Sequence, residues 1–313
     1  MRYVKFSLYL AKIFWILILS GFAHLSLAVD DGTLTYTTSG SNITITGCVD
    51  TCPSDLVIPG VINDLTVTSI GTSAFQNTAL TSVTIPDSVT SIGGRAFSGA
   101  VSLTSVTFGS GLKSIAERAF QNTALTSLTI PNSVTTIGSY AFQGLTSLTS
   151  LTLGSGITSV GYNSFEGICT SSVNNLISAE LNLSNIPSEL LQNCTQLSSL
   201  ILGDSVITIG SNAFQNTALT SVTIPDSVTN IGAYAFSGAA SLTSVTFGLG
   251  VTSIGDYAFQ DTALTSVTIP DSVTSISSSA FSGAASLTSV TFGSGLTSIG
   301  TSAFQNTALT SVT

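Results

Sequence analysis

The chain has few charged residues and almost none of several residue types on which catalysis and nucleic-acid binding depend. Charged residues make up 7% of its 313 residues, with six lysines and arginines, one histidine, one methionine and one tryptophan. So few cations cannot neutralise a row of phosphates, which argues against nucleic acid and anionic lipid as partners. A single histidine leaves little scope for Ser-His or Cys-His catalysis. The composition therefore does not favour an enzyme.

The N-terminus has the three-part pattern of an export signal. A basic start, Met1–Lys5, precedes a largely apolar core, Ile13–Phe22, and the small residues Ser26 and Ala28 stand at the −3 and −1 positions of a cleavage site. That core is too short to cross a bilayer, which disfavours an uncleaved membrane anchor. We predict that residues 1–28 are a secretory signal peptide and that the protein is secreted or displayed at the cell surface.

The predicted signal peptide contains most of the rare residues. His24, Trp15 and Met1 all lie in it, as do three of the six basic residues. The remaining chain has three basic and fifteen acidic residues, a net charge of −12, and no histidine. No later segment is long and apolar enough to span a membrane, so we expect no membrane insertion of the mature chain.

Four cysteines follow the predicted signal peptide: Cys48, Cys52, Cys169 and Cys194. An even number in an exported protein favours disulfides, and four cysteines allow three pairings. Cys48 and Cys52 are close enough for a local bridge, whereas Cys169 and Cys194 are 25 residues apart, about one repeat. Adjacent coils about 4.8 Å apart lie within the Cα separation that a disulfide accepts. A zinc site with all four thiolates is the alternative, and it would need two distant pairs to meet.

One sequence unit recurs along most of the chain. The segment Leu80–Phe97 returns almost unchanged at Leu219–Phe236 and Leu264–Phe281. The phenylalanines that close successive units are Phe75, Phe97, Phe120, Phe142, Phe165, Phe214, Phe236, Phe259, Phe281 and Phe304. Their spacings alternate between 22 and 23 residues, except for a gap of 49 that contains one degenerate unit ending in Ser188–Cys194. This period is typical of a solenoid, here of about eleven coils, in which each coil buries its apolar face against its neighbours.

The residues of one unit predict the path of one coil. Polar and apolar side chains alternate after Leu80, which predicts a short strand with Val83 inward and Thr84 outward. Pro86 has no N–H and ends this strand. Gly94–Phe97 is predicted to form a short helical turn, and the stacked phenylalanines to form an interior spine. Seven apolar positions are expected to point inward: Leu80, Val83, Ile85, Val89, Ile92, Ala96 and Phe97.

The units come in pairs and define three regions. One member of each 45-residue pair carries Ile-Pro-Asp-Ser-Val and the other Phe-Gly-x-Gly. We predict a signal peptide over 1–28, a strand-rich N-terminal cap over 29–65 and a solenoid over 66–313, with the degenerate coil at about 169–194. The sequence stops within a unit, at Leu309–Thr313. An open core and strand edge would result, so we expect a fragment of a longer chain or a missing capping and anchoring region.

The unit L-x-x-V-x-I-P-x-S-V-x-x-I-G-x-x-A-F closely resembles the repeat of BspA-type, or Treponema pallidum-type, leucine-rich repeat surface proteins. The resemblance extends from about Val67 to the C-terminus and rests on ten near-copies and one degenerate coil. It implies a right-handed coil with a short parallel β-strand and a short helical turn in each repeat. It also implies export or surface exposure, with adhesion to host proteins, other cells or extracellular matrix. The family has no catalytic residues to transfer.

One stripe of positions varies where the rest of the unit is nearly constant. These are the two residues before Ala-Phe, and stacked coils would place Arg95, Arg118 and Tyr140 in a row and Tyr234 beside Tyr257. Tyrosine and arginine are frequent binding anchors, so these five residues are the candidate ligand-binding residues. The alternative is an outward turn that tolerates any residue.

Other polar groups carry weaker hypotheses. The strand face with Ser82, Thr84 and their repeats could bind a sugar, a protein or ice, and plain solvation of an exposed sheet is the alternative. Asp226 and Asp271 occupy matching positions two coils apart and are interpreted as turn formers, not as a catalytic pair. We expect no cofactor and no metal.

These observations predict a non-enzymatic, adhesin-like binding protein. It would recognise an extracellular protein or glycan through many weak contacts along the solenoid surface. A structural or matrix exoprotein without a defined ligand is the alternative, with ice binding as a minor branch.

Overall fold

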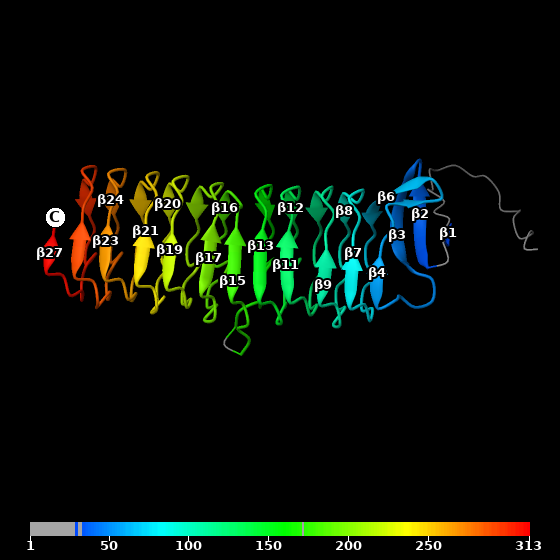
Figure 1. Ribbon diagram of the computed structural model, residues 1–313, viewed down its shortest axis with the longest axis horizontal. Helices are drawn as coiled ribbons and strands as arrows, with labels where there is room; N and C mark the ends of the chain where they lie inside the picture. The colour runs from blue at the N-terminus through cyan, green and yellow to red at the C-terminus, as the bar shows by residue number, and fades with distance from the viewer. Residues whose placement is uncertain (1–28, 31–32, 171) are drawn as a thin grey trace, which may run out of the picture.

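The computed structural model describes residues 29–30, 33–170 and 172–313, so the predicted signal peptide lies outside the described residues. Figure 1 shows a long row of stacked coils, with β1 (Val29–Asp30), β2 (Leu34–Ser39) and β3 (Asn42–Cys48) at one end and β27 (Ser311–Val312) at the other. The described residues form no helix, and so none that could cross a membrane. The fold is a β-solenoid of the leucine-rich repeat type, as the repeat predicts.

The first strand of each coil belongs to a row of parallel strands along one face. In the described residues these are β4 (Asp55–Val57), β7 (Ser82–Thr84), β9 (Ser105–Thr107), β11 (Ser127–Ile130), β13 (Ser150–Leu153), β15 (Ser178–Leu181), β17 (Ser199–Leu202), β19 (Ser221–Thr223), β21 (Ser244–Thr246), β23 (Ser266–Thr268), β25 (Ser289–Thr291) and β27. Equivalent residues pair across coils, for example Val83 with Val106. The row consists of four short sheets, β4-β7-β9, β11-β13-β15-β17, β19-β21 and β23-β25-β27.

The second strand of each coil forms another parallel row. Its members are β6 (Leu65–Ile70), β8 (Ser91–Ile92), β10 (Ser114–Ile115), β12 (Thr136–Ile137), β14 (Ser159–Val160), β16 (Asn185–Ile186), β18 (Thr208–Ile209), β20 (Asn230–Ile231), β22 (Ser253–Ile254), β24 (Ser275–Ile276) and β26 (Ser298–Ile299). One sheet runs from β1 to β14 and another from β16 to β26. The break between β14 and β16 falls at the degenerate coil.

An antiparallel hairpin precedes the coils. β2 pairs with β3, and β3 then pairs in parallel with β6, whereas β5 (Val61–Ile62) pairs with β6 antiparallel. β4 already pairs with β7 in the first-strand row. The first coil therefore starts at Asp55, inside the range 29–65 that the sequence assigns to the cap. Leu56 and Ile58 are buried like the inward residues of later strands, which explains this earlier start.

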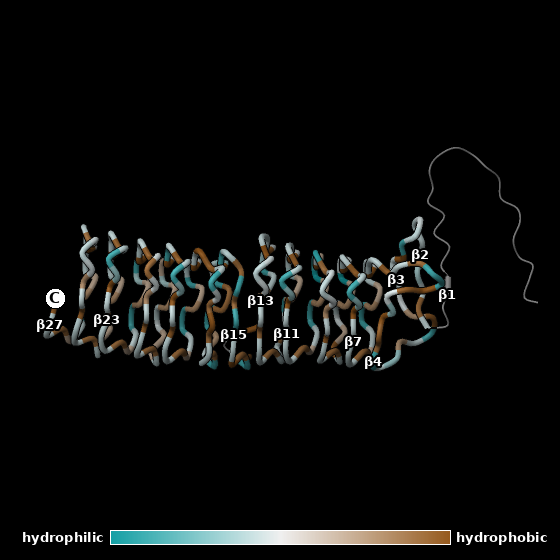
Figure 2. Tube along the Cα trace, turned by 45° about the horizontal axis from the view of Figure 1, so that its top comes forward, coloured by the Kyte–Doolittle hydropathy of each residue, from teal (hydrophilic) through white to brown (hydrophobic). Residues whose placement is uncertain are grey.

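The core runs along the axis of the solenoid. All seven apolar positions predicted to point inward in the unit Leu80–Phe97 are at most 2% exposed, which confirms the coil prediction. Phenylalanine rings stack from Phe75 to Phe165 with centroids 4.9–5.5 Å apart, and from Phe214 to Phe304 at 5.2–5.4 Å. Leu191 is fully buried in the degenerate coil between these two stacks. Figure 2 shows hydrophobic segments recurring from coil to coil.

The helical turn predicted at Gly94–Phe97 is a hydrogen-bonded turn and not a helix. The N–H of Ala96 donates to the carbonyl of Gly93 at 3.2 Å. Arg95, within this turn, has a φ of 56°, in the left-handed region. Its N–H therefore donates to Glu117 of the next coil, at 3.0 Å, and not along a helix axis. The apolar pattern, which is the same for both conformations, could not show the sign of φ.

Close backbone contact explains why two kinds of coil alternate. A Cβ atom added at Gly109 would lie 2.4 Å from the Pro86 carbonyl group, and one at Gly111 would lie 2.0 Å from the carbonyl oxygen of Asp87. The Ile-Pro-Asp segment of one coil therefore requires glycine at both positions of the next coil. The 45-residue pairing seen in the sequence is a packing requirement.

Candidate functional site

The five predicted ligand-binding residues, which we call the turn stripe, occupy equivalent positions in their coils: Arg95, Arg118, Tyr140, Tyr234 and Tyr257. Each has a φ of 56–58°. Each N–H donates to a carbonyl of the next coil at 2.9–3.0 Å. Arg95 is exposed and the other four are half-buried. The hydrogen-bond ladder thus holds these side chains at the spacing of the coils.

The turn stripe forms two aromatic clusters. Tyr234 and Tyr257 stack face to face, with centroids 4.7 Å apart and planes inclined by 5°. In the N-terminal half, the Arg118 guanidinium lies over the Tyr140 ring, 5.1 Å from its centroid. The Tyr140 ring meets the ring of Tyr162 edge-on at 5.8 Å. Tyr162 is 70% exposed, so this cluster presents a large aromatic surface to solvent.

The structure does not unite the whole stripe. Arg118 forms an ion pair with Glu117 at 2.6 Å, and no other ion pair occurs in the described part of the chain. Arg95 therefore has no ion pair among the described residues and does not belong to either aromatic cluster. Tyr140 and Tyr234 are four coils apart, which is at least about 19 Å at the usual strand spacing. The two clusters are therefore separate contact points. Tyr162 is not among the residues that the sequence pattern selects, because only the stacking of the coils shows that its ring meets Tyr140.

The Ser/Thr strand face is less uniform than the sequence suggests. Many threonine hydroxyls beside the strands donate to a carbonyl of the preceding coil, as Thr104 does to Thr81 at 3.1 Å. These hydroxyls reinforce stacking. The outward positions equivalent to Thr84 hold Glu180 and the 58%-exposed Ile201 in two adjacent coils. A charge and a large apolar side chain interrupt any regular hydroxyl array there.

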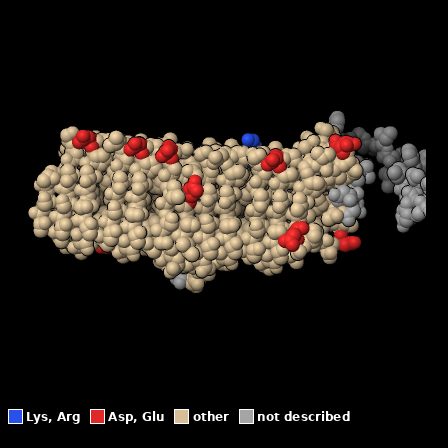
Figure 3. Space-filling model, in the orientation of Figure 1, with Lys and Arg blue, Asp and Glu red and all other residues tan. Residues whose placement is uncertain are grey.

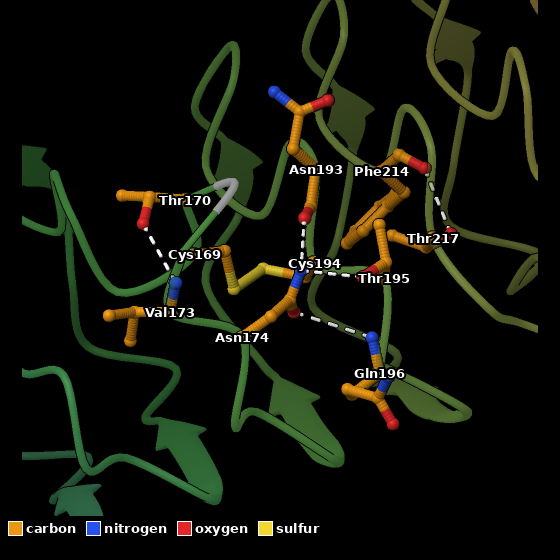
Figure 4. The surroundings of a disulfide bond; sticks show 10 residues. All are labelled: Cys169, Thr170, Val173, Asn174, Asn193, Cys194, Thr195, Gln196, Phe214 and Thr217. Carbon is orange, nitrogen blue, oxygen red and sulfur yellow. Dashed lines mark hydrogen bonds between the residues drawn. A yellow bond between two sulfur atoms is a disulfide. The ribbon is translucent and has the colours of Figure 1, made fainter.

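The structure contains two disulfides, Cys48–Cys52 and Cys169–Cys194. The second joins the coil of Phe165 to the degenerate coil, with a Cα–Cα distance of 5.0 Å. Figure 4 shows its surroundings, where Asn174 reaches the degenerate coil through bonds to Asn193 and Thr195. All four thiols are thus in disulfides, and none is available as a zinc ligand.

Acidic side chains bond to neighbouring coils and not to one another. Asp87 accepts the backbone N–H of Ser110 at 2.6 Å, and Asp271 accepts that of Ser294 at 2.6 Å. These bonds from backbone N–H groups hold the pKa of both carboxyls below the usual range of aspartate. Figure 3 shows scattered acidic residues on an otherwise mostly uncharged face. Among the described residues, no three His, Cys, Asp or Glu side chains gather as a metal site.

The repeat geometry agrees with comparison against known families. The family model of the BspA-type leucine-rich repeat region matches residues 68–198, 113–233 and 207–313. The chain belongs to this family. BspA-type leucine-rich repeats are in general non-catalytic interaction scaffolds, so membership indicates a non-enzymatic surface or binding role.

Solved structures show similar folds. A leucine-rich cell surface protein from Faecalibacterium prausnitzii is 27% identical, with 91% of this chain and 76% of that chain covered and a TM-score of 0.51. The leucine-rich repeat protein of T. pallidum is 24% identical, with 69% and 91% covered and a TM-score of 0.51, and it shows the shared fold alone. No curated protein matches the sequence.

Proposed function

We propose that this BspA-type protein is secreted or held at the cell surface and acts as an adhesin-like binding protein. Its partner is an extracellular protein or glycan, which it contacts through the turn stripe. The observation that supports this most is the pair of aromatic clusters, Tyr234 with Tyr257 and Arg118 with Tyr140 and Tyr162. Aromatic and arginine side chains are the anchors that dominate binding energy in interfaces.

The backbone supports this use of the stripe. Each stripe residue is fixed by an N–H bond to the next coil, and stacking restricts the tyrosine rings further. Side chains that are already ordered lose less conformational entropy on binding, which favours affinity. Two clusters whose nearest rings, Tyr162 and Tyr234, are three coils apart also allow one large ligand to be held at two points.

Export is part of this proposal and rests on the N-terminal sequence. The segment 1–28 has the basic, apolar and small-residue regions of a signal peptide. The similar protein from Faecalibacterium prausnitzii is described as a cell surface protein. N-terminal sequencing of exported protein should find Val29 as the first residue, and an intact Met1 would contradict cleavage.

A five-residue variant tests the turn stripe. All five residues are replaced by serine, which is native at the same position and similar φ in Ser279 and Ser302. Binding to cells and to a glycan panel should be lost, while the melting temperature changes little because the coil already accommodates serine at this position and none of the five side chains belongs to the buried core. The matched control replaces Ser82, Thr84 and their counterparts in adjacent coils by lysine.

The two variants separate the possible surfaces. Full binding by the serine variant with loss in the lysine variant would place the site on the strand face. Binding by both, at unchanged melting temperature, would contradict a ligand site on either surface and favour a structural matrix protein.

A further inference from the structure

One junction between coils lacks the backbone bonds that join all its neighbours. Three N–H groups of each turn donate to three carbonyls of the next, as Phe142 does to Ser164 at 2.8 Å. The same bonds occur again from the degenerate coil onward, where the N–H of Leu191 donates to the carbonyl of Ala213 at 2.9 Å. At the junction between, none of the six groups has a hydrogen-bond partner among the described residues: the N–H groups of Asn163, Phe165 and Gly167 and the carbonyls of Ser188, Leu190 and Gln192.

Two further ladders stop at the same place. β14 and β16 do not pair, although both second-strand rows continue away from them. Side-chain amide bonds run from Gln121 through Gln143 to Glu166 and begin again only between Gln192 and Gln215. A cavity of about 420 Å³ occupies this junction, lined by residues 160–169, 187–190, 192 and 193. Its size is within the range of ligand-binding cavities.

The sequence of the degenerate coil explains the opening. The residue after the second strand normally donates its N–H to the preceding coil, as Gly161 does to Ile137 at 2.8 Å. Pro187 occupies that position and has no N–H. The first and second strands of this coil start only seven residues apart, at Ser178 and Asn185, whereas nine is the separation in the coils on both sides. A shorter span draws β16 away from β14.

The opening is held on two sides and does not divide the solenoid. β13 and β15 remain paired over four residues. The Cys169–Cys194 disulfide closes the opposite corner, and Asn174 donates to the Asn193 carbonyl at 2.8 Å. The slot is therefore a fixed feature of the fold, with donors on one wall and acceptors on the other.

We propose that this junction slot binds an extended, lysine- or arginine-bearing segment of a partner protein. Along each edge such a segment presents the C=O and the N–H of every second residue, so it can offer carbonyls to the donor wall and N–H groups to the acceptor wall by strand addition. The exposed side chains of Glu166 and Glu189 belong to the two walls, and no basic residue lines the slot. A basic segment is therefore favoured over an acidic one.

Synthetic peptides test the slot directly. The probe is a six-residue peptide that alternates threonine and lysine, and the controls are its threonine–glutamate counterpart and a lysine peptide with alternate amides N-methylated. Only the unmodified lysine peptide should bind, and it should slow hydrogen exchange of the Asn163, Phe165 and Gly167 amides at least tenfold by NMR. Binding of the N-methylated peptide with equal affinity would overturn the ladder, and absence of binding would overturn the proposal.

Charge variants provide the second measurement. Glu166→Gln with Glu189→Gln should weaken binding of the lysine peptide at least fivefold, and glutamine is native at the position of Glu166 in other coils, as in Gln143. Asp204→Asn removes an exposed charge outside the slot lining and should leave binding unchanged. If Asp204→Asn weakened peptide binding as much as the double glutamate variant does, the peptide would be attracted only by the overall negative charge, and the proposed site would be overturned. The serine variant of the turn stripe leaves the slot lining unchanged. It should therefore still bind the lysine peptide, so the slot proposal and the proposed adhesion through the turn stripe can be tested separately.

Discussion

At the scale of single residues, left-handed backbone positions set the shape of every coil. Arg95 has a φ of 56°, and four residues later Gly99 has a φ of 73°. The position of Gly99 holds asparagine in the preceding coil, and a Cβ at Gly99 would lie 2.1 Å from Oδ1 of Asn77. Asparagine and glycine tolerate this region best. Arginine and tyrosine in the turn stripe therefore hold a costly conformation, which is consistent with selection for their side chains.

Replacing a stripe residue by asparagine should stabilise the fold. Arg95→Asn keeps a polar, exposed side chain and relieves left-handed strain, so we expect a gain of about 0.5–1 kcal/mol in the free energy of unfolding by urea denaturation. Lys113→Asn is the control, because Lys113 is exposed and is not among the left-handed residues. A similar gain in both variants would contradict the role of φ.

Glycines at close contacts should not tolerate a side chain. Gly111→Ala places a Cβ 2.0 Å from the Asp87 carbonyl oxygen, so the backbones of two coils must separate, and we expect a loss of about 1–3 kcal/mol. Gly94→Ala is the matched control, because the atom nearest to its added Cβ would be 3.5 Å away. Equal melting temperatures for the two variants would refute close contact as the reason for glycine.

At the scale of the coil, stacking depends on contacts between equivalent elements. The Asp87 side chain of one Ile-Pro-Asp coil accepts the Ser110 N–H of the next, and Asn132 accepts that of Ser155 in the same way at 2.9 Å. The sequence predicts only that the aspartate of this segment forms a turn, whereas in the structure it also bonds to the next coil. It ties two coils together.

These aspartates should make stability depend on pH in acid. Their pKa in the folded chain is below the ordinary value of aspartate, so their contribution to stability is present above the unfolded pKa and is lost as pH falls through the folded pKa. The melting temperature should therefore decrease when the pH is lowered below about 4. Asp87→Asn with Asp271→Asn keeps an acceptor oxygen, as in Asn132, and should reduce this fall. An unchanged pH profile would contradict the assignment.

The phenylalanine spine should be sensitive to truncation. Phe120 is fully buried between Phe97 and Phe142, so Phe120→Ala should cost about 3–5 kcal/mol in urea denaturation. Phe120→Leu should cost clearly less, because Leu191 fills the equivalent place in the degenerate coil. Equal losses for the two substitutions would show that ring stacking, and not filled volume, dominates the spine.

At the scale of the whole molecule, the junction slot interrupts the turn ladder and the second-strand row between two blocks of coils. The blocks share the pairing of β13 with β15 and the Cys169–Cys194 disulfide. In a solenoid each coil is stabilised mainly by its nearest neighbours, so a weak junction lowers cooperativity locally.

Hydrogen exchange should reveal this weak junction. Amides of Asn163, Phe165 and Gly167 should exchange much faster than those of Tyr140, Phe142 and Gly144, whose N–H groups are bonded to the next coil. Reduction of the disulfide should widen the difference. Uniform protection across both sets of amides would mean that the junction closes in solution.

The sequence by itself determined the architecture, because a repeat of 22–23 residues with fixed apolar positions has only its neighbours to pack against. Val83, Phe97 and their counterparts could be placed inside from alternation and spacing alone. The approximate length of the solenoid followed by counting units.

Only the tertiary structure decided features that depend on contact between coils. The left-handed φ of Arg95 goes together with a hydrogen bond to the next coil, which the apolar pattern does not record. The meeting of Tyr140 with Tyr162 and the requirement for Gly111 depend on side chains and backbones more than twenty residues apart. The junction slot was visible in sequence only as an irregular spacing. Its open ladder results from the missing N–H of Pro187 and the shortened coil, acting against a neighbour that kept its normal shape.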